Sequence, residues 1–233
     1  MTSDTDPLAR PVGAPVTGAF PRPRPAHVPH IGRYVRLDPM RRSDGEGLFD
    51  AFAQDPDGLG WTYLPIYPWA DVDAARQFCT DRQASADPMF YTLRDTAGIA
   101  SGFCSLLRIA PEIGSIEVGY IHFAPRAQQT AMATEAMALL MRHAFDDLGY
   151  RRYEWKCDAL NAPSRAAAAR LGFTYEGTFR QASITKGRNR DTAWFSILDH
   201  EWPALREAFD AWLDPANFDG DGRQIRSLSD FRA

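Results

Sequence analysis

Apolar and polar residues recur along the chain with the spacings of strands and helices. Alternating or continuous apolar runs predict strands over 33–38, 89–94, 99–109, 113–123, 151–159, 173–181 and 191–199. Helical spacing predicts helices over 43–54, 71–85, 131–148, 162–171 and 200–212. Ser43 is expected to cap the first of these helices, Gly172 to end the fourth, and Lys186 and Gly187 to form a turn between the last two strands.

The longest helical pattern, 131–148, implies a helix that packs closely on a sheet. Its wide apolar face leaves a narrow polar face formed by Glu135, Arg142 and Asp146. The helix links strand 113–123 to strand 151–159, and crossovers of this kind are right-handed and join parallel neighbours. We therefore expect an α/β domain around a mixed sheet.

Proline is concentrated at the start of the chain. Of the 17 prolines in 233 residues, seven lie in residues 1–30. Because proline lacks a backbone donor, this segment is expected to be a disordered or extended arm that joins no strand ladder. It is either a docking arm for a neighbouring subunit or a loosely attached tail. Residues 214–233 predict a polar C-terminal tail, so the compact domain is expected over 31–213.

Charge and cysteine content exclude several classes of protein. The formal net charge of −4 argues against a general nucleic-acid binder, and no run of 18 apolar residues predicts a membrane span. Cys79, Cys104 and Cys157 show no spacing typical of a disulfide framework or a metal site. We therefore expect a cytoplasmic protein with three reduced, mostly buried thiols, no metal, and neither nucleic acid nor membrane as a partner.

The segment 116–136 predicts an anion site. A buried strand ends at Phe123, Pro125 interrupts it, and a polar loop leads into the long helix, whose first backbone N–H groups and dipole favour an anion. The loop supplies small residues that let a ligand approach the backbone, and polar side chains: Ala131 and Ala133, and Arg126, Gln128, Gln129, Thr130 and Thr134. The alternative is an ordinary helix start with capping residues.

A second group of polar residues follows strand 151–159. Asn161 stands at the strand end, Pro163 in the first turn of a helix, and Ser164 next to it. Taken alone, this pattern is also explained by Asn161 capping the helix and Ser164 lying in its first turn.

Together the two groups resemble the GNAT superfamily of acyl-CoA-dependent N-acetyltransferases, most of all its RimJ/RimL-like branch. The resemblance rests on Asn-x-x-Ser at 161–164, an Ala/Arg-rich helix ending in Gly-Phe, and the following Tyr-Glu-Gly. It covers roughly 33–200 and is most specific in 113–200. It implies an α/β fold of the α+β type: a mixed, mostly antiparallel sheet, splayed at a central parallel strand pair, with helices on both faces.

The resemblance implies acetyl-CoA as cosubstrate. Backbone groups of Ile121 and Phe123 would bind its pantetheine arm, and the loop and helix start would bind its pyrophosphate through Arg126, Gln128, Gln129, Thr130, Ala131, Met132, Ala133 and Thr134. Ala131 stands where the family has a glycine. A helical φ suits alanine at this position, whereas a left-handed φ would not.

The resemblance also implies the roles of the reacting groups. Ser164 is the candidate proton donor to the leaving thiolate, Asn161 would orient the pantetheine, and Glu117 is the candidate base. Glu117 has an alternative role as a strand carboxylate paired with a nearby arginine, and a positioned neutral amine would need no dedicated base. Arg151–Arg152 and 186–190 are solvated faces or turns, although either segment could reach the 3′-phosphate of coenzyme A.

The acceptor site is expected near the aromatic loop before the second helix. Trp61 and Tyr63 wall the acceptor pocket or simply cover the sheet edge, and His122 is interpreted as a packed or hydrogen-bonded side chain. We expect an acetyl transfer to the primary amine of a small molecule or a protein N-terminus, by direct attack in a ternary complex. The alternative, motivated by Ala131, is a non-catalytic acyl-CoA-binding or regulatory module. Whether the chain forms a homodimer is left open.

Overall fold

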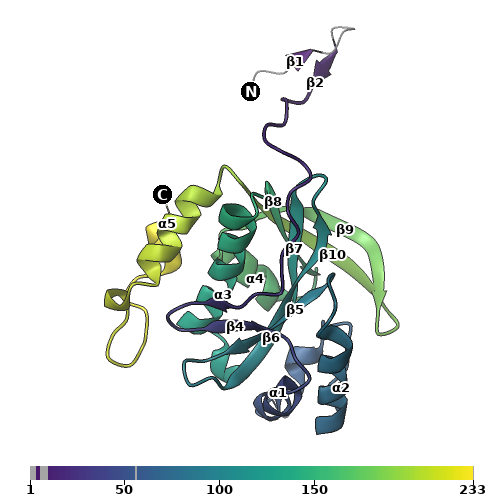
Figure 1. The fold of residues 1–233 in the computed structure, drawn as a ribbon, viewed down its shortest axis with the longest axis vertical. Coiled ribbons are helices and arrows are strands. Elements are labelled where there is room, and N and C mark those ends of the chain that lie inside the picture. The colour runs from purple at the N-terminus through teal and green to yellow at the C-terminus, as the bar shows by residue number, and fades with distance from the viewer. Residues whose placement is uncertain (1–3, 6–9, 56, 233) are drawn as a thin grey trace.

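One open sheet of eight strands forms the centre of the computed structural model, which describes residues 4–5, 10–55 and 57–232 (Figure 1). The strand order is β3-β4-β5-β6-β7-β8-β10-β9, and β7 and β8 are the parallel pair of this otherwise antiparallel sheet. The bounds are β3 (His30–Ile31), β4 (Arg36–Pro39), β5 (Met89–Arg94), β6 (Ala100–Ala110), β7 (Ser115–Phe123), β8 (Arg152–Asp158), β9 (Thr174–Thr185) and β10 (Arg188–Leu198). The predicted mixed sheet with a central parallel pair is thus confirmed.

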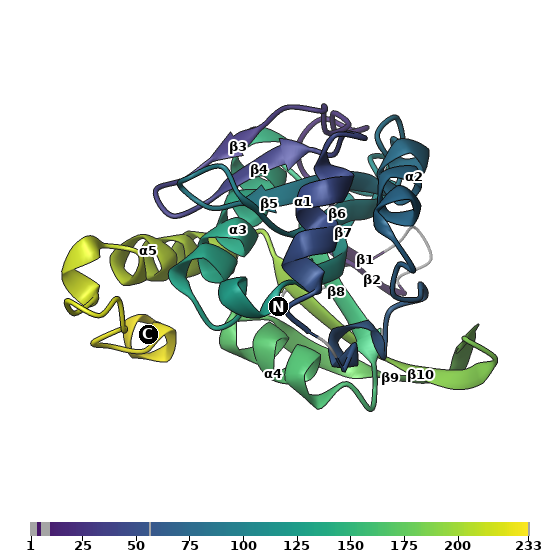
Figure 2. The same cartoon turned by 90° about the horizontal axis from the view of Figure 1, so that it is seen from below.

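Helices cover both faces of this sheet, as Figure 2 shows. Their bounds are α1 (Asp44–Phe52), α2 (Val72–Arg82), α3 (Ala131–Arg142), α4 (Ala162–Arg170) and α5 (Trp202–Trp212). A π-helical turn, His143–Asp147, prolongs α3, and short 3-10 turns lie at Leu59–Trp61, Pro125–Ala127, Pro215–Asn217 and Leu228–Phe231. None of the helices in the described part of the chain is both long and apolar enough to cross a lipid bilayer.

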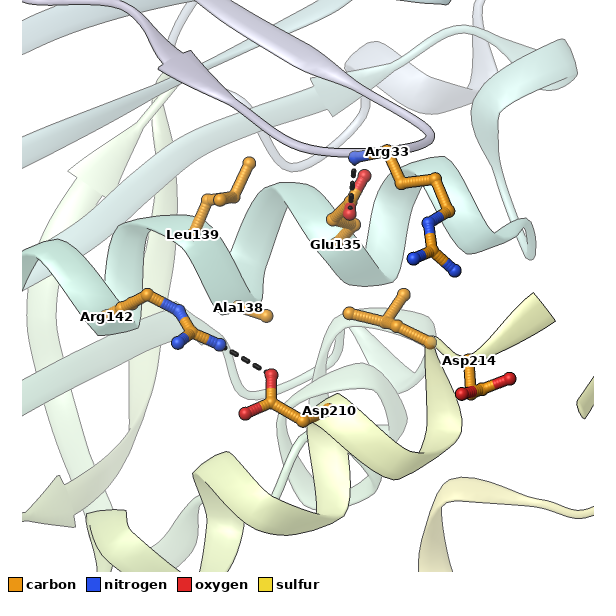
Figure 3. A pocket seen from close by; sticks show the side chains of 8 residues that line it. Arg33, Glu135, Ala138, Leu139, Arg142, Asp210 and Asp214 are labelled. Carbon is orange, nitrogen blue, oxygen red and sulfur yellow. Dashed lines mark hydrogen bonds and ion pairs between the residues drawn. The ribbon is translucent and has the colours of Figure 1, made fainter. Parts of the chain in front are cut away.

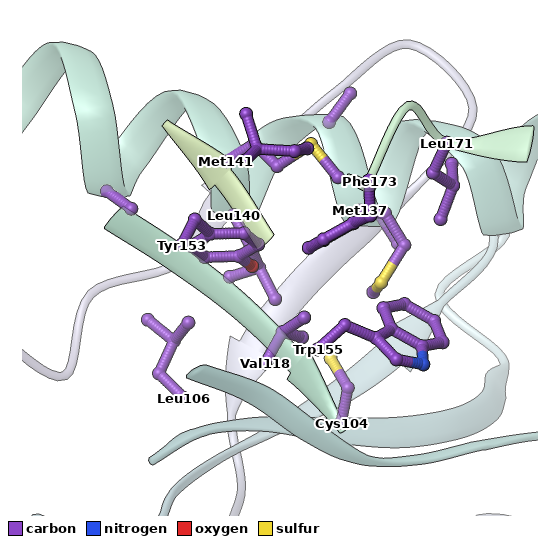
Figure 4. Close-up of a cluster of buried hydrophobic side chains, with 14 of the residues drawn as sticks. Cys104, Leu106, Val118, Met137, Leu140, Met141, Tyr153, Trp155, Leu171 and Phe173 are labelled. Carbon is purple, nitrogen blue, oxygen red and sulfur yellow. The ribbon is translucent and has the colours of Figure 1, made fainter. Parts of the chain in front are cut away.

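Alternation along the strands divides the apolar side chains between two cores. In β5, Met89 and Tyr91 join the core under α3, whereas Phe90 joins the core under α1 and α2. In the larger core, Met137 and Leu140 of α3 pack near Val118 of β7 (Figure 4). Because both faces of β6 and β7 are covered, these strands have the nearly continuous apolar sequence that the pattern shows.

The cysteines and the N-terminal segment test two expectations. Cys79, Cys104 and Cys157 are buried and form no disulfide, as expected. The expectation that residues 1–30 join no ladder is wrong, because β1 (Asp4–Thr5) pairs with β2 (Pro11–Val12), and His30 of β3 pairs with Leu37 of β4. These ladders involve two residues per strand, which lets proline take part at the edges.

Part of the proline-rich segment is attached to the body of the domain. The backbone N–H of Arg22 donates to the carbonyl of Pro111 (2.9 Å), and the Tyr91 hydroxyl donates to the carbonyl of Ala26 (3.4 Å). The β1–β2 pair, in contrast, projects away from the sheet (Figure 1). From Arg22 onward the chain therefore lies against β5 and the end of β6.

Two local expectations are corrected by the structure. Ser43 makes no capping hydrogen bond, because its backbone is helical whereas a side-chain cap needs an extended backbone. Its neighbour Asp44 instead accepts from the backbone N–H of Arg41 (2.9 Å). Strand 33–38 begins later than predicted, at Arg36, since residues 32–35 form the turn between β3 and β4.

Glu135, on the predicted polar face of α3, is 7% exposed. Its carboxylate accepts a hydrogen bond from the backbone N–H of Arg33 (2.8 Å; Figure 3) and another from that of Tyr34 (2.6 Å), both in the β3–β4 turn. Further along α3, Arg142 pairs with Asp210 of α5 (2.6 Å). The predicted polar face of this helix thus connects it to two neighbouring segments.

A buried group of charged side chains bridges the parallel strands. The Nζ atom of Lys156 on β8 lies 2.8 Å from Glu117 on β7 and 2.6 Å from Glu154 on its own strand. The side chains of Lys156 and Glu117 are each 6% exposed, whereas that of Arg108, which contacts Glu117 at 3.2 Å, is 67% exposed. Lys156 is thus the buried cation that compensates two adjacent carboxylates.

His122 is packed in the smaller core, as one of the two interpretations of the sequence had it. Its ring stacks on Phe52 with the centroids 4.0 Å apart, and its Nε2 atom is buried without a hydrogen-bond partner. Burial lowers the pKa of His122 from 6.5 to about 4, against the weak opposing charge of Asp55. The folded protein therefore holds this imidazole neutral at pH values where the unfolded chain protonates it.

We predict that acid destabilises the protein through His122. Between pH 6.5 and 4 the unfolded chain binds a proton at His122 that the folded chain does not, so the free energy of unfolding falls as pH falls. His122→Phe should keep the stacked ring and recover roughly 2–3 kcal/mol of this loss at pH 4.5, measured by urea unfolding at pH 7.5 and 4.5. His200→Phe, at an exposed position, is the matched control. Equal losses in wild type and His122→Phe would contradict the prediction.

We further predict unequal effects of removing the two cations that contact Glu117. Lys156→Met leaves two neighbouring carboxylates without their buried partner, so it should lower the free energy of unfolding by about 3 kcal/mol. Arg108→Met removes an exposed partner of the same carboxylate and should cost less than about 1 kcal/mol. Chemical denaturation at pH 7 measures both values. Similar values for the two variants would show that Lys156 does not hold the strand pair together.

Candidate active site

The parallel ladder between β7 and β8 stops partway along both strands. Pairing runs from Ser115 and Arg152 to Val118 and Trp155, although β7 continues to Phe123 and β8 to Asp158. Beyond Val118, Tyr120 adopts a left-handed φ of 49°, where the register of β7 against β6 shifts. Such a bulge bends its strand, so the two strands separate from this point onward.

A cavity of about 360 Å³ lies where the strands separate. One group of lining residues comes from the two strands and the start of α4, namely Val118, Ile121, Trp155, Cys157, Asn161 and Ser164. A second group comes from the β9–β10 hairpin and from the loop around the 3-10 turn η1 (Leu59–Trp61), here called the η1 loop, and includes Tyr63, Leu64, Phe179, Ser183, Arg190 and Trp194. Glu117, Lys156 and Arg108 also line the cavity. A cleft with two chemically different walls can hold two reactants at once.

The start of α3 has the geometry of an anion site. Thr130 caps α3, since its Oγ1 atom accepts from the backbone N–H of Ala133 (3.4 Å) and donates to the carbonyl of Ala127 (2.7 Å). The backbone N–H groups of Ala131 and Met132 precede the first intrahelical bonds and have no carbonyl of the helix to pair with. These donors, with the helix dipole, favour a phosphate group at this end of α3.

Ala131 fits this loop in place of the glycine that the family carries. It is the first residue of α3 and has a helical backbone, which alanine adopts without strain. The left-handed residue of the loop is Gln129, with a φ of 58°. With alanine at this position, the backbone N–H groups at the start of α3 can still donate hydrogen bonds to a phosphate. Ala131 therefore gives no reason to expect a non-catalytic module.

Two predicted phosphate ligands are directed elsewhere in this structure. Arg126 donates from Nε to Ser101 Oγ (3.1 Å) and from a terminal nitrogen to the carbonyl of Ala100. Gln128 donates from Nε2 to the carbonyl of Phe123 (2.8 Å). Both side chains thus hold the loop to the end of the sheet. Since Gln128 occupies the carbonyl of Phe123, Ile121 is the predicted pantetheine contact that still faces the cavity.

Asn161 and Ser164 lie side by side at the start of α4. The Asn161 Oδ1 atom accepts from the backbone N–H of Ser164 (3.1 Å), so Asn161 caps the helix as well as lining the cavity. The Ser164 Oγ atom accepts from Nε1 of Trp155 (3.0 Å), so its hydroxyl can donate its own proton to another group, such as the adjacent Cys157 thiolate. Burial raises the pKa of the Cys157 thiol, and the adjacent Ser164 hydroxyl opposes this rise.

Glu117 lines the cavity, and its environment alters its acidity. Burial raises the pKa of its carboxyl group above the ordinary value, and the charges of Lys156 and Arg108 oppose the rise. It is paired with a lysine as well as the arginine that the sequence suggested. A buried carboxylate with a raised pKa is a better proton acceptor than an exposed one.

Tyr63 lines the cavity, whereas Trp61 does not and fits the other interpretation of the sequence, a side chain that covers the sheet. The ring of Trp61 is 3% exposed and packs among Phe52, Trp69 and His122, so it covers the sheet and does not line the cavity. Tyr63 does line the cavity, and its hydroxyl donates to the carbonyl of Leu160 (3.1 Å). In the described residues, no cluster of three or more His, Cys, Asp or Glu side chains is placed to hold a metal ion.

Sequence analysis does not single out Lys156, Phe179 or Trp194, which line the cavity, and it gives Arg190 only as part of the 186–190 segment. Alternation along strand 191–199 does place Thr192 and Trp194 on one face. Which face meets the cleft depends on the pairing of Thr192 with Asp158 of β8 and Phe179 of β9. A single sequence does not specify that register.

Comparison with known proteins agrees with this geometry. The family model described as "Acetyltransferase (GNAT) domain" matches residues 35–174. The Bacillus subtilis (strain 168) protein YdaF, which carries the provisional name of a ribosomal N-acetyltransferase, is 30% identical over 181 residues, which cover 74% of this chain and 95% of YdaF.

Two solved structures extend the similarity to the whole fold. A GCN5-related N-acetyltransferase from Brucella melitensis is 46% identical, with a TM-score of 0.89, over 92% of this chain and 98% of that one. A GNAT-family protein from Chromobacterium violaceum is 39% identical, with a TM-score of 0.77, over 85% of this chain and 100% of that one. The chain therefore belongs to the GNAT acetyltransferase family, in its RimJ/RimL-like branch, and is an acyltransferase.

Proposed function

We propose that this protein transfers an acetyl group from acetyl-CoA to the primary amine of a small molecule or a protein N-terminus, within a ternary complex. The observation that carries the proposal is the cavity at the separated ends of β7 and β8. One of its walls carries Ile121 and Ser164, and the other carries Tyr63 and the hairpin, so the two reactants can meet over Glu117.

The N-terminus of α3 is the proposed site for the pyrophosphate of coenzyme A. Its support is the free backbone N–H groups of Ala131 and Met132 and the helical backbone of Ala131. Thr134 and Ala133 belong to the same first turn, and Arg126 and Gln128 hold the loop from behind. The backbone of Ile121 and the side chain of Asn161 are the proposed contacts of the pantetheine arm.

The reaction needs two proton movements, for which the cavity offers two groups. The neutral amine nitrogen attacks the thioester carbon, the carbon–sulfur bond breaks, and an amide and a thiol are formed. We assign Glu117, directly or through a water molecule, as the acceptor of the proton that leaves the amine. Ser164 is assigned as the donor of a proton to the thiolate, because its hydroxyl proton is free of the bond from Trp155.

We propose a small amine or a protein N-terminus as the acceptor and the cytoplasm as the cellular setting. The cavity is large enough for a small amine or the first residues of a peptide, and the provisional name of YdaF adds weight to a protein N-terminus. Three buried cysteines without disulfides suit the cytoplasm. The homodimer stays a prediction, with the proline-rich segment as its candidate docking arm.

We predict that Ser164→Ala lowers kcat by roughly 10- to 1000-fold, as the loss of one general acid does. The affinity for coenzyme A should change little, because no phosphate contact is removed. Thiol release from acetyl-CoA with a panel of amines, and calorimetry with coenzyme A, measure the two effects. Ser183→Ala removes a hydroxyl from the opposite wall of the same cavity and is the matched control. A normal kcat in Ser164→Ala would remove this residue from the mechanism.

We also predict that Ala131→Asp abolishes binding of coenzyme A. The new carboxylate would stand at the first turn of α3, where it repels the pyrophosphate and competes for the backbone donors. Ala166→Asp introduces the same charge on the exposed face of α4 and should bind normally. Calorimetric titration with coenzyme A gives both affinities. Unchanged affinity in Ala131→Asp would mean that the pyrophosphate binds elsewhere.

A further inference from the structure

The β9–β10 hairpin lines the cavity with side chains to which the proposed reaction assigns no role of their own. Phe179, Arg190, Thr192 and Trp194 from this hairpin all line the cavity. The rings of Phe179 and Trp194 stack with their centroids 4.6 Å apart, and the ammonium group of Lys156 lies 3.7 Å from the Trp194 centroid. The wall is therefore flat, aromatic and held in place by packing.

Contacts at the hairpin tip fix this wall against the η1 loop. Lys186 donates from Nζ to the carbonyl of Trp61 (2.7 Å) and lies over the ring of Tyr67, 4.7 Å from its centroid. The same loop carries Tyr63, which also lines the cavity. The hairpin thus reaches across the acceptor side of the cleft. These contacts do not involve the start of α3.

Two donors on this wall are buried and lack a partner within the described part of the chain. The Nε atom of Arg190 and the Nε1 atom of Trp194 are inaccessible to solvent and make no hydrogen bond to a described residue. Buried donors are satisfied in most folded proteins, and an unsatisfied one is costly. Two such donors on one strand face, both lining one cavity, indicate a ligand that supplies the missing acceptor atoms.

Arg190 differs from the other cations of the cavity in having no counter-ion. Among the described residues, Arg108 and Lys156 each form an ion pair with Glu117, but no ion pair includes Arg190. Asp158 also lines the cavity, and its carboxylate accepts from the backbone N–H of Leu160 (2.9 Å). Arg190 and Ser164 line the same cavity, and the charge of Arg190 lowers the pKa of the Cys157 thiol against the larger, opposite effect of burial.

We propose that the β9–β10 hairpin binds an acceptor that carries an anionic group besides its amine, with Arg190 recognising a carboxylate or a phosphate. The planar guanidinium fits either anion through two parallel hydrogen bonds. Trp194 donates to a further oxygen of the acceptor, and its apolar part packs on Phe179. The amine is then held on the side of Glu117. This inference rests on the proposed acetyl transfer and names the class of its acceptor.

Matched pairs of amines test this subsite through turnover. L-Phenylalanine is compared with L-phenylalaninamide for a carboxylate, and O-phosphoethanolamine with ethanolamine for a phosphate. In the wild type, at least one anionic member should have a kcat/KM about 10- to 100-fold above its neutral counterpart. Arg190→Gln should abolish this preference, while Arg188→Gln, which removes an exposed charge from the same strand, should keep it.

A binding measurement separates the subsite from the chemistry. Quenching of tryptophan fluorescence by the same four amines, with coenzyme A present, reports occupancy next to Trp194 without turnover. Arg190→Gln should weaken the anionic amine about 10- to 100-fold and leave the affinity for coenzyme A unchanged. If Arg190→Gln fails to fold, Arg190→Lys keeps the charge without the planar fork and should weaken the anionic amine at least about threefold.

Three results would overturn the inference. Equal binding and turnover of anionic and neutral amines by the wild type would show that the wall selects no anion. Equal effects of Arg190→Gln and Arg188→Gln would assign the preference to general charge. Weaker binding of coenzyme A in Arg190→Gln would place the arginine at the cosubstrate's phosphates. Binding of an anionic amine without any turnover would support the subsite and contradict the proposed acetyl transfer.

Discussion

The interruption of the ladder between β7 and β8 is the constraint on which the site depends. Over Ser115–Val118 the parallel strands share hydrogen bonds and a common core, and past that point each follows its other neighbour, β6 or β10. The left-handed backbone of Tyr120 marks the change. Separation of paired strands exposes backbone groups inside the domain, and such groups need partners. A ligand in the cavity can therefore form hydrogen bonds with backbone groups that the separated strands leave unpaired.

The surroundings of the cleft resist the tendency of such an opening to collapse. On one face α3 packs Met137 and Leu140 over the still-paired part of the strands, and Glu135 ties the helix to the β3–β4 turn. On the other face Lys156 pairs with Glu117 and Glu154 beside the opening, and these carboxylates also pair with Arg108 and Arg152. The same ion pair that supports the strands also sets the acidity of the candidate base. Stability and chemistry therefore depend on shared residues here.

Sequence patterns predicted the elements well where the signal is local. The helix at 131–148, the crossover to a parallel strand and the turn at Lys186–Gly187 depend on periodicity and chain order, and each appears in the structure. Local patterns carry less information where distant segments meet. The pattern places Glu135 on a polar face but does not show its partners in the β3–β4 turn, and it does not decide whether Trp61 walls a pocket or covers the sheet. Arg190 and Trp194 face the cavity because of the register in which β10 pairs with β8 and β9, and no local sequence pattern specifies that register.

The central claim is that the separated strands form the channel for the pantetheine arm. A crystal structure of the protein with bound coenzyme A tests it most directly. We expect the pyrophosphate at the backbone N–H groups of Ala131 and Met132, the arm between β7 and β8 in contact with the backbone of Ile121, and the sulfur close to Ser164 Oγ. Coenzyme A bound outside the space between β7 and β8, with its sulfur away from Ser164, would contradict the account.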